Sequence, residues 1–285
     1  MDISFYSLFF FIITTLLYIS SVPVIGKPKL MLVKNSLSEA DLGEYYSESM
    51  KKMGMFLLIV ICTQLALNIS YLIDKCQGSA GKNVGAGVIL TLIPWLLIFG
   101  VMMMIITAFS GLKNVFSDVI GYFAISGSAS DLLSQVLIST NINDLIDKEP
   151  DPQKQKELTS AAEALMKICG NNSILINQMY PDNFINIWDK MKPLMKEGVY
   201  AADAGPEGLK QQILDLVVLR ENIGEGLWYI YTAILVSSIV YYNLDTRGCV
   251  KDINSIKADY DAYEKGQVEQ EKQEELNNST VYTIS

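Results

Sequence analysis

Residues 78–82, with the sequence GSAGK, come closest to a motif that performs chemistry, because glycines beside a lysine can bind the phosphates of a nucleotide. The phosphate-binding loop requires the order G-x-x-x-x-G-K-[ST]. Here the two glycines are too close together, and Asn83 follows the lysine where serine or threonine is needed. The spacing therefore favours a flexible connection between two helices.

The other residue types that carry out catalysis are absent or scattered. The sequence has no histidine, which removes the usual general base and the most common metal ligand. Its four cysteines form no C-x-x-C pair, so their spacing does not predict a zinc site. We therefore expect no catalytic residue, no cofactor and no metal, and we predict that the protein is not an enzyme.

The elements that would position any functional residue are mostly apolar helices. Half of the 285 residues are hydrophobic, and four stretches have no charge at their centres: 3–25, 53–73, 85–109 and about 223–244. Each is long enough to approach or exceed the roughly 20 residues that a helix needs to cross a bilayer. Before the first stretch stands Asp2, with no Lys or Arg, which is typical of a spanning segment rather than of a cleaved signal. We predict an all-α membrane protein with about four transmembrane helices.

The polar segments divide the chain into four regions. Residues 1–110 hold three transmembrane helices with short loops, residues 111–222 an acidic helical extramembrane domain, residues 223–244 the fourth transmembrane helix, and residues 245–285 an acidic partner-binding tail. The domain has ten Lys or Arg against fifteen Asp or Glu, and the whole chain has a net charge of −9. This balance argues against direct binding to nucleic acid.

Start and stop signals predict the helices of the extramembrane domain. One helix should begin at Asp182 and end near Pro193, and another should begin at Pro206 and continue into the fourth span. The first of these should bury four side chains: Phe184, Trp188, Met191 and Met195. The small residues at 126–130, SGSAS, should form a turn that caps a helix at Asp131.

Three polar residues lie inside the second span: Thr63, Gln64 and Asn68. They could line a path for ions, so a small channel or transporter is the alternative function. Transporters typically place ionisable groups in the membrane, and none of these three side chains ionises. We favour hydrogen bonds between helices, with close helix contact at three glycines: Gly85, Gly87 and Gly100.

Lys and Arg near the ends of the spans give a small bias in orientation. The first loop and the helical domain together have eight, whereas the second loop and the tail have five. Because the side with more Lys and Arg is usually cytosolic, we expect the N-terminus, the second loop and the tail on the other face. Cys76 and Cys249 then share one face at similar depth. They form a disulfide if the second and fourth spans are neighbours, and otherwise they are two separate thiols.

The tail has apolar residues at helical spacing directly after the fourth span. Four of them are spaced 3, 4 and 3 residues apart: Ile253, Ile256, Tyr260 and Tyr263. This seam is too short for an autonomous coiled coil, so we predict that it binds a partner protein. Packing on the protein's own domain or on lipid headgroups is the alternative. Residues 271–285 should be disordered alone, and 280–284, TVYTI, could add as a strand to a neighbouring sheet.

Three stretches resemble a known family: RGCVKD at 247–252, DYDAYEKGQ at 259–267 and ISGSASDLLSQVLISTNINDLIDKE at 125–149. Together they resemble the membrane-anchored minor capsid proteins of nucleocytoplasmic large DNA viruses, such as chlorella viruses. The resemblance covers roughly residues 110–265 and supplies no active-site residues. It implies a structural protein of the virion internal membrane, derived from the host endoplasmic reticulum. Such a protein would anchor capsid or scaffold proteins to this bilayer, in many copies within a large assembly.

Overall fold

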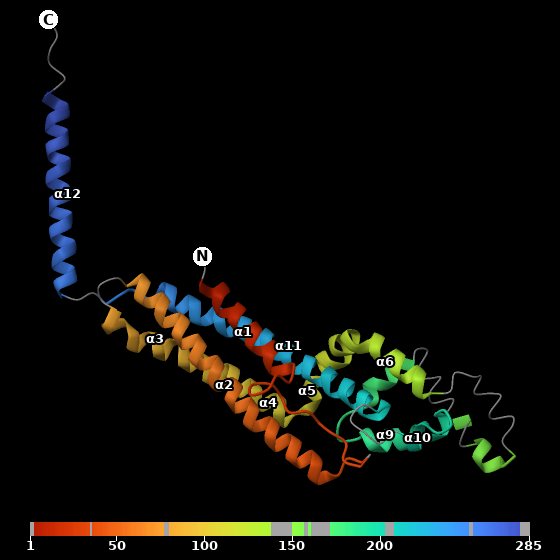
Figure 1. The fold of residues 1–285 in the computed structure, drawn as a ribbon. Coiled ribbons are helices and arrows are strands. Elements are labelled where there is room, and N and C mark those ends of the chain that lie inside the picture. Colours follow the sequence, from red (N-terminus) through yellow and green to blue (C-terminus); the bar gives the residue numbers. More distant parts are fainter. Residues whose placement is uncertain are drawn as a thin grey trace, which may run out of the picture.

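The computed structural model describes residues 3–34, 36–76, 80–137, 150–156, 159–160, 172–202, 208–250 and 253–279. Within these ranges the chain is helical and has no β-strand, only two isolated β-bridges. Figure 1 shows an elongated bundle with a group of shorter helices at one end, while α12 (Ile253–Ser279) stands off the other end. The predicted all-α fold class is confirmed.

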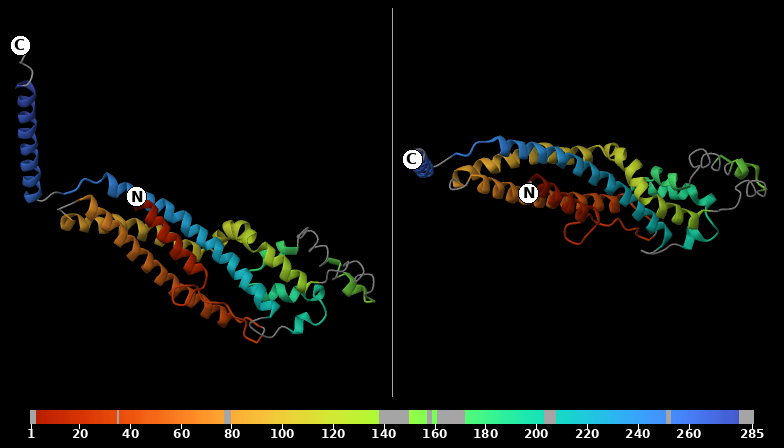
Figure 2. Two further views of the ribbon diagram at one scale, coloured as in Figure 1. Left: turned by 45° about the horizontal axis from the view of Figure 1, so that its top comes forward. Right: turned by 90° about the horizontal axis from the view of Figure 1, so that it is seen from above.

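The bundle is built from four helical segments, which lie along one another in both views of Figure 2. They are α1 (Ile3–Ile19), α2 (Glu39–Lys75), α11 (Leu209–Thr246), and the run α3 (Ala80–Pro94), η1 (Trp95–Gly100) and α4 (Val101–Ala108). In the described part of the chain, three helices are long and apolar enough to cross a membrane: Glu39–Lys75, Asn83–Ala108 and Leu209–Thr246. These correspond to the second, third and fourth predicted spans.

The first predicted span is shorter in the structure than the sequence indicates. The helix α1 has 17 residues, and at about 1.5 Å per residue it covers roughly 25 Å, less than the roughly 30 Å core of a bilayer. It ends at Ile19 because the chain turns through Ser21 and Val24, both with positive φ. A count of four full-length spans is therefore not established, although α1 packs along both α2 and α11.

Charged side chains lie at both ends of the uncharged part of the bundle. On α2 this part runs from Lys52 to Asp74, and on α11 it runs from Glu225 to Asp245. At about 1.5 Å per residue both intervals measure roughly 30 Å, which is the thickness of a hydrocarbon core. These two levels mark where the bundle would meet the two surfaces of a membrane.

The described residues bury two separate hydrophobic cores, and α11 contributes to both. Its first half, with Ile213 and Val217, packs into the core of the helical domain, and its second half, with Ala233 and Val240, packs into the bundle. The predicted continuation of this helix into the fourth span is confirmed. The first loop also joins the domain core through Leu30, which sequence reasoning did not anticipate.

The helical domain contains α5 (Ser110–Phe116), η2 (Ser117–Gly121), α6 (Tyr122–Val136), η3 (Asn172–Gln178), α9 (Phe184–Met191), η4 (Lys192–Leu194) and α10 (Val199–Ala202). The helix expected from Asp182 is confirmed as α9 with η4, and its four expected core residues are buried. The expected turn at 126–130 is wrong, because α6 runs through it. Ile125, Ala129 and Leu133 recur every four residues on one buried face, and this packing outweighs the weak helix preference of the small residues.

The close approaches between backbones are not at the glycines that we expected. A Cβ on Gly85 would meet nothing within 4 Å, and one on Gly100 would meet only the Trp95 carbonyl at 3.8 Å. Of these three glycines only Gly87 lies against another helix, where an added Cβ would stand 3.0 Å from Leu72 Cδ2 on α2. The tightest approach between helices joins η2 to α11, where a Cβ on Gly121 would stand 2.6 Å from the Arg220 carbonyl oxygen and one on Gly224 would stand 2.7 Å from the Ser117 nitrogen.

Candidate functional site

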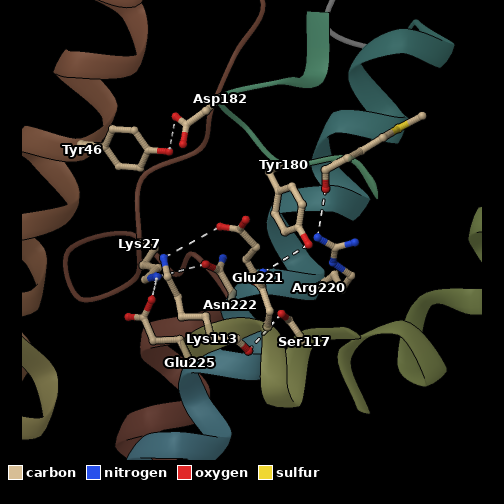
Figure 3. A network of polar contacts seen from close by, with 12 residues as sticks. Lys27, Tyr46, Lys113, Ser117, Tyr180, Asp182, Arg220, Glu221, Asn222 and Glu225 are labelled. Atoms are coloured by element: carbon tan, nitrogen blue, oxygen red, sulfur yellow. Dashed lines mark hydrogen bonds and ion pairs between the residues drawn. The ribbon is translucent and has the colours of Figure 1, made fainter. Parts of the chain in front are cut away.

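A network of buried charges lies where the bundle meets the helical domain (Figure 3). The Lys27 ammonium, from the first loop, lies 2.6 Å from Glu225 Oε2, and both side chains are only 8% exposed. Lys27 also donates to Asn222 Oδ1 at 3.1 Å, and the Tyr229 hydroxyl donates to Glu225 Oε1 at 2.7 Å. This ion pair is therefore compact, and both of its members have a further hydrogen bond, at the end of the apolar part of α11.

A second ion pair in the network is much looser. The ammonium of Lys113, on α5, lies 3.9 Å from Glu221 Oε2, beyond hydrogen-bond distance. Near it the Tyr46 hydroxyl donates to Asp182 Oδ1 at 2.8 Å, and so joins α2 to the loop before α9. Figure 3 shows the Glu221 carboxylate between the Tyr46–Asp182 contact and Lys27.

Arg220 joins α11 to η3 and to the loop after it. Its guanidinium donates to the carbonyls of Ile176 and Met179, and it lies 4.9 Å from the centre of the Tyr180 ring. Burial raises the pKa of the nearby Asp118 carboxyl, and Arg220 opposes this rise. Burial, followed by the negative charge of Asp118, raises the pKa of the Tyr180 hydroxyl. The arrangement fixes the domain to the bundle.

A cavity of about 570 Å³ lies among these groups. Its wall holds four tyrosines, two lysines and three carboxylates: Tyr18, Tyr45, Tyr46, Tyr180, Lys27, Lys113, Asp182, Glu221 and Glu225. Sequence reasoning missed this cavity, because its walls come from five segments that are distant in the chain: 18–27, 45–53, 107–114, 180–183 and 221–225. The one local signal was Glu225, a single carboxylate at the start of an otherwise uncharged span.

No protein-family model, curated protein or solved structure matches this chain. In the residues that the structure describes, no three His, Cys, Asp or Glu side chains gather in a way that could hold a metal ion. The function must therefore be inferred from the geometry of the chain itself.

The opposite end of the bundle carries a second set of contacts, which fix the start of the tail. Cys76 and Cys249 form a disulfide with their Cα atoms 5.4 Å apart, so the end of α2 is joined to the chain after α11. The residue after Cys249 is held by two hydrogen bonds to the Asn83 side chain. The Asn83 amide donates to the Val250 carbonyl at 3.2 Å and accepts from the Val250 N–H at 3.0 Å. Lys75 donates to the Leu244 carbonyl at 3.0 Å. The sequence left open whether the two cysteines pair, and in the structure they do.

The structure places the four residues predicted to bind a partner on α12. Their exposed fractions are 68% for Ile253, 53% for Ile256, 61% for Tyr260 and 65% for Tyr263. Each α12 side chain that the structure describes is exposed. The helix also continues past Gly266 to Ser279, so part of the segment expected to be disordered is helical. The proposed strand at 280–284 lies outside the described residues.

The polar residues of the second span lie in the middle of the bundle. Gln64 donates to the Ser7 carbonyl at 2.9 Å and accepts from the Ser7 hydroxyl, which joins α2 to α1. Thr63 bonds within its own helix to the Ile59 carbonyl at 2.8 Å, and Asn68 is buried. The expected hydrogen bond between helices is thus confirmed at Gln64.

Proposed function

We propose that the protein is a structural membrane protein that anchors a protein scaffold to a bilayer and performs no reaction. The observation that carries this proposal is α12, which projects from the bundle with Ile253, Ile256, Tyr260 and Tyr263 exposed. Four large apolar side chains at 3, 4, 3 spacing on a charged helix are a docking face for a partner helix. A helix of this kind gains stability mainly when another protein covers its apolar face.

The contacts at the start of α12 support a load-bearing role for the tail. The disulfide and the Asn83–Val250 hydrogen bonds attach the tail to α2 and α3 as well as to α11. A flexible display of a binding motif would need only the chain connection to α11. The additional attachments favour a function in which the direction and position of the tail matter.

The disulfide also supports an orientation. Disulfides persist in oxidising compartments and are rare in the cytosol, so the face with Cys76 and Cys249 is the non-cytosolic one in this proposal. The lower count of Lys and Arg on that face supports the same orientation. The helical domain and α12 would then meet partners on different sides of the membrane.

The resemblance to minor capsid proteins supports a more specific version of the proposal. In that version the bilayer is the internal membrane of a large DNA virus, derived from the host endoplasmic reticulum. The partners are other capsid or scaffold proteins, present in many copies. The membrane-facing bundle supplies the anchor, since withdrawing its apolar helices from lipid would expose a large hydrophobic area.

The proposal is tested by co-purification from native membranes in a mild detergent. Replacing Ile256 and Tyr260 together by serine should release the associated proteins, as should truncation after Val250. The matched control replaces Val268 and Leu276 by serine, because they are exposed on α12 but point about 100° and 180° away from the seam. Equal retention in the seam variant and the control would contradict the proposal.

The same preparation distinguishes the alternative function. A channel or transporter would move ions or solutes across vesicles that contain the purified protein alone, and Asn68→Leu would abolish the flux. Flux of this kind, with unchanged partner binding in the seam variant, would replace the anchoring proposal.

A further inference from the structure

We propose that the cavity at the junction of bundle and domain binds the headgroup of a zwitterionic phospholipid, with the phosphate near Lys113 and the amine near Glu221. This inference goes beyond the anchoring function, because it concerns the other end of the bundle and a lipid instead of a protein. Its basis is the depth of the cavity, the state of its ion pairs and the nature of its walls.

The cavity lies at the depth of lipid headgroups. Its wall runs along α2 from Tyr45 to Met53, the first residue of the uncharged stretch, and so covers about 12 Å along the helix axis. Thr107, close to the end of α4, lines the same membrane-facing side. A headgroup layer is roughly 5–8 Å thick on each side of the hydrocarbon core, so the cavity extends through this layer. Met50 on its wall is 57% exposed, which leaves an apolar edge for the acyl chains.

The two ion pairs of the cavity differ in whether they can accept a ligand. Lys27 and Glu225 are in direct contact and have further hydrogen bonds, so opening them would be costly. Lys113 and Glu221 lie 3.9 Å apart without a direct hydrogen bond, although each is only 16–17% exposed. A zwitterion can enter between them, because its phosphate and its amine each gain an oppositely charged partner.

The tyrosines and the excess of carboxylates favour a ligand with a positive group. The wall holds two lysines and three carboxylates, so it is net negative before a ligand binds. Tyr45, Tyr46 and Tyr180 line the cavity together with Glu221, and aromatic faces attract ammonium and quaternary ammonium groups. A lipid that carries only a phosphate would satisfy Lys113 and leave the Glu221 side of the cavity without a positive partner.

The size of the cavity fits this ligand class. Its volume of about 570 Å³ lies within the range of roughly 300–1,000 Å³ that small-molecule sites occupy. A phosphocholine or phosphoethanolamine group fits within such a space, while its glycerol and chains remain in the bilayer beside Met50 and Met53.

The test uses the full chain in uncharged detergent micelles, with short-chain phosphatidylcholine, phosphatidylethanolamine or phosphatidylglycerol added to separate samples. A ligand that binds the folded state raises the midpoint of thermal unfolding. Phosphatidylcholine and phosphatidylethanolamine should raise the midpoint, and phosphatidylglycerol should not. Glu221→Gln and Lys113→Gln should each raise the lipid concentration that a given shift of the midpoint requires by about tenfold or more. Each substitution removes one charged hydrogen-bond partner of the lipid headgroup.

Matched controls come from exposed residues of the same charge on α2, Glu48→Gln and Lys51→Gln, which should respond like the wild type. A second measurement needs no variant: the wild type, purified from an equal mixture of phosphatidylcholine and phosphatidylglycerol, should retain phosphatidylcholine in excess when its bound lipids are weighed by native mass spectrometry. Equal retention of both lipids would overturn the proposal. An equal response to free phosphate or soluble choline would assign the cavity to a soluble ligand, and would overturn it too.

Discussion

Replacing Lys27 by methionine should destabilise the protein strongly, and a second change at Glu225 should restore part of the loss. In the wild type the two charges are 2.6 Å apart and 8% exposed, so the pair is largely removed from solvent. Methionine keeps the length and apolar stem of lysine but leaves the Glu225 carboxylate buried without a cation in contact, so that only the more distant Lys113 charge remains beside it. The Tyr229 hydroxyl still donates its hydrogen bond to Glu225 at 2.7 Å, but this neutral group does not balance the negative charge of the carboxylate. Removing one partner of a buried ion pair costs about 3–5 kcal/mol, and we expect a loss in that range.

The double variant Lys27→Met with Glu225→Gln removes both charges. The glutamine oxygen can still accept the hydrogen bond from Tyr229, and the uncompensated charge is gone. Because replacing both partners of a buried pair is often close to neutral, the double variant should be more stable than Lys27→Met alone. The two changes should therefore be coupled by about 2 kcal/mol or more, which is within the range for residues in direct contact.

Denaturant titration in detergent micelles at pH 7 measures the free energies of unfolding of four proteins: the wild type, Lys27→Met, Glu225→Gln and the double variant. Raising the salt concentration should change the coupling little, since ions screen a buried pair weakly. As a control, Lys51→Met removes an exposed lysine from α2 and should shift the stability by less than about 0.5 kcal/mol. Additive effects of the two changes, or a loss below about 1 kcal/mol for Lys27→Met, would refute the reasoning.

Three further predictions concern other contacts. Gly224→Ala should lower the thermal midpoint by the equivalent of about 1–3 kcal/mol, because its Cβ would stand 2.7 Å from the Ser117 nitrogen, whereas Gly85→Ala should not lower it. Cys76→Ser should remove the difference in gel mobility that the wild type shows between reducing and non-reducing conditions, and it should lower the free energy of unfolding by about 2–4 kcal/mol. A wild type and a Cys76→Ser variant with the same mobility under non-reducing conditions would contradict the pairing. Burial raises the pKa of Asp118, so the folded state binds more protons there and stability should fall as the pH rises from about 4 through the folded-state pKa. In denaturant titrations the free energy of unfolding of Asp118→Asn should lack this part of the pH dependence. The same pH profile in Asp118→Asn and in the wild type would contradict the prediction.

Much of the bundle could be predicted because the deciding signal is local. The uncharged stretches that became α2, the α3–α4 run and the second half of α11 are visible without any knowledge of their neighbours. The amphipathic pattern of α9 is equally local, since Phe184 and Trp188 are one turn apart and both are buried.

The features that were predicted wrongly, or not predicted at all, depend on contacts between segments that are distant in the sequence. The small residues at 126–130 look like a turn in isolation, but Ile125 and Leu133 are drawn into a core built partly by α11 and the first loop. The close approach of η2 and α11 requires glycine at Gly121 and Gly224, and nothing in the sequence around either residue indicates that the two elements would cross there. The junction cavity likewise needs the first loop, α2, α5 and α11 together, so its lysines and carboxylates read separately as ordinary surface charges.

The double attachment at the start of α12 determines how the protein would respond to a pull. If a partner of the proposed kind pulls on the tail, the tension passes at Cys249 into two long apolar helices, through the backbone into α11 and through the disulfide into α2. Extracting the protein would then require both helices to leave the lipid together, whereas reducing the bond would leave α11 to bear the strain alone. In the proposed anchoring role, the protein would therefore resist such a pull best under oxidising conditions, in which the disulfide stays intact.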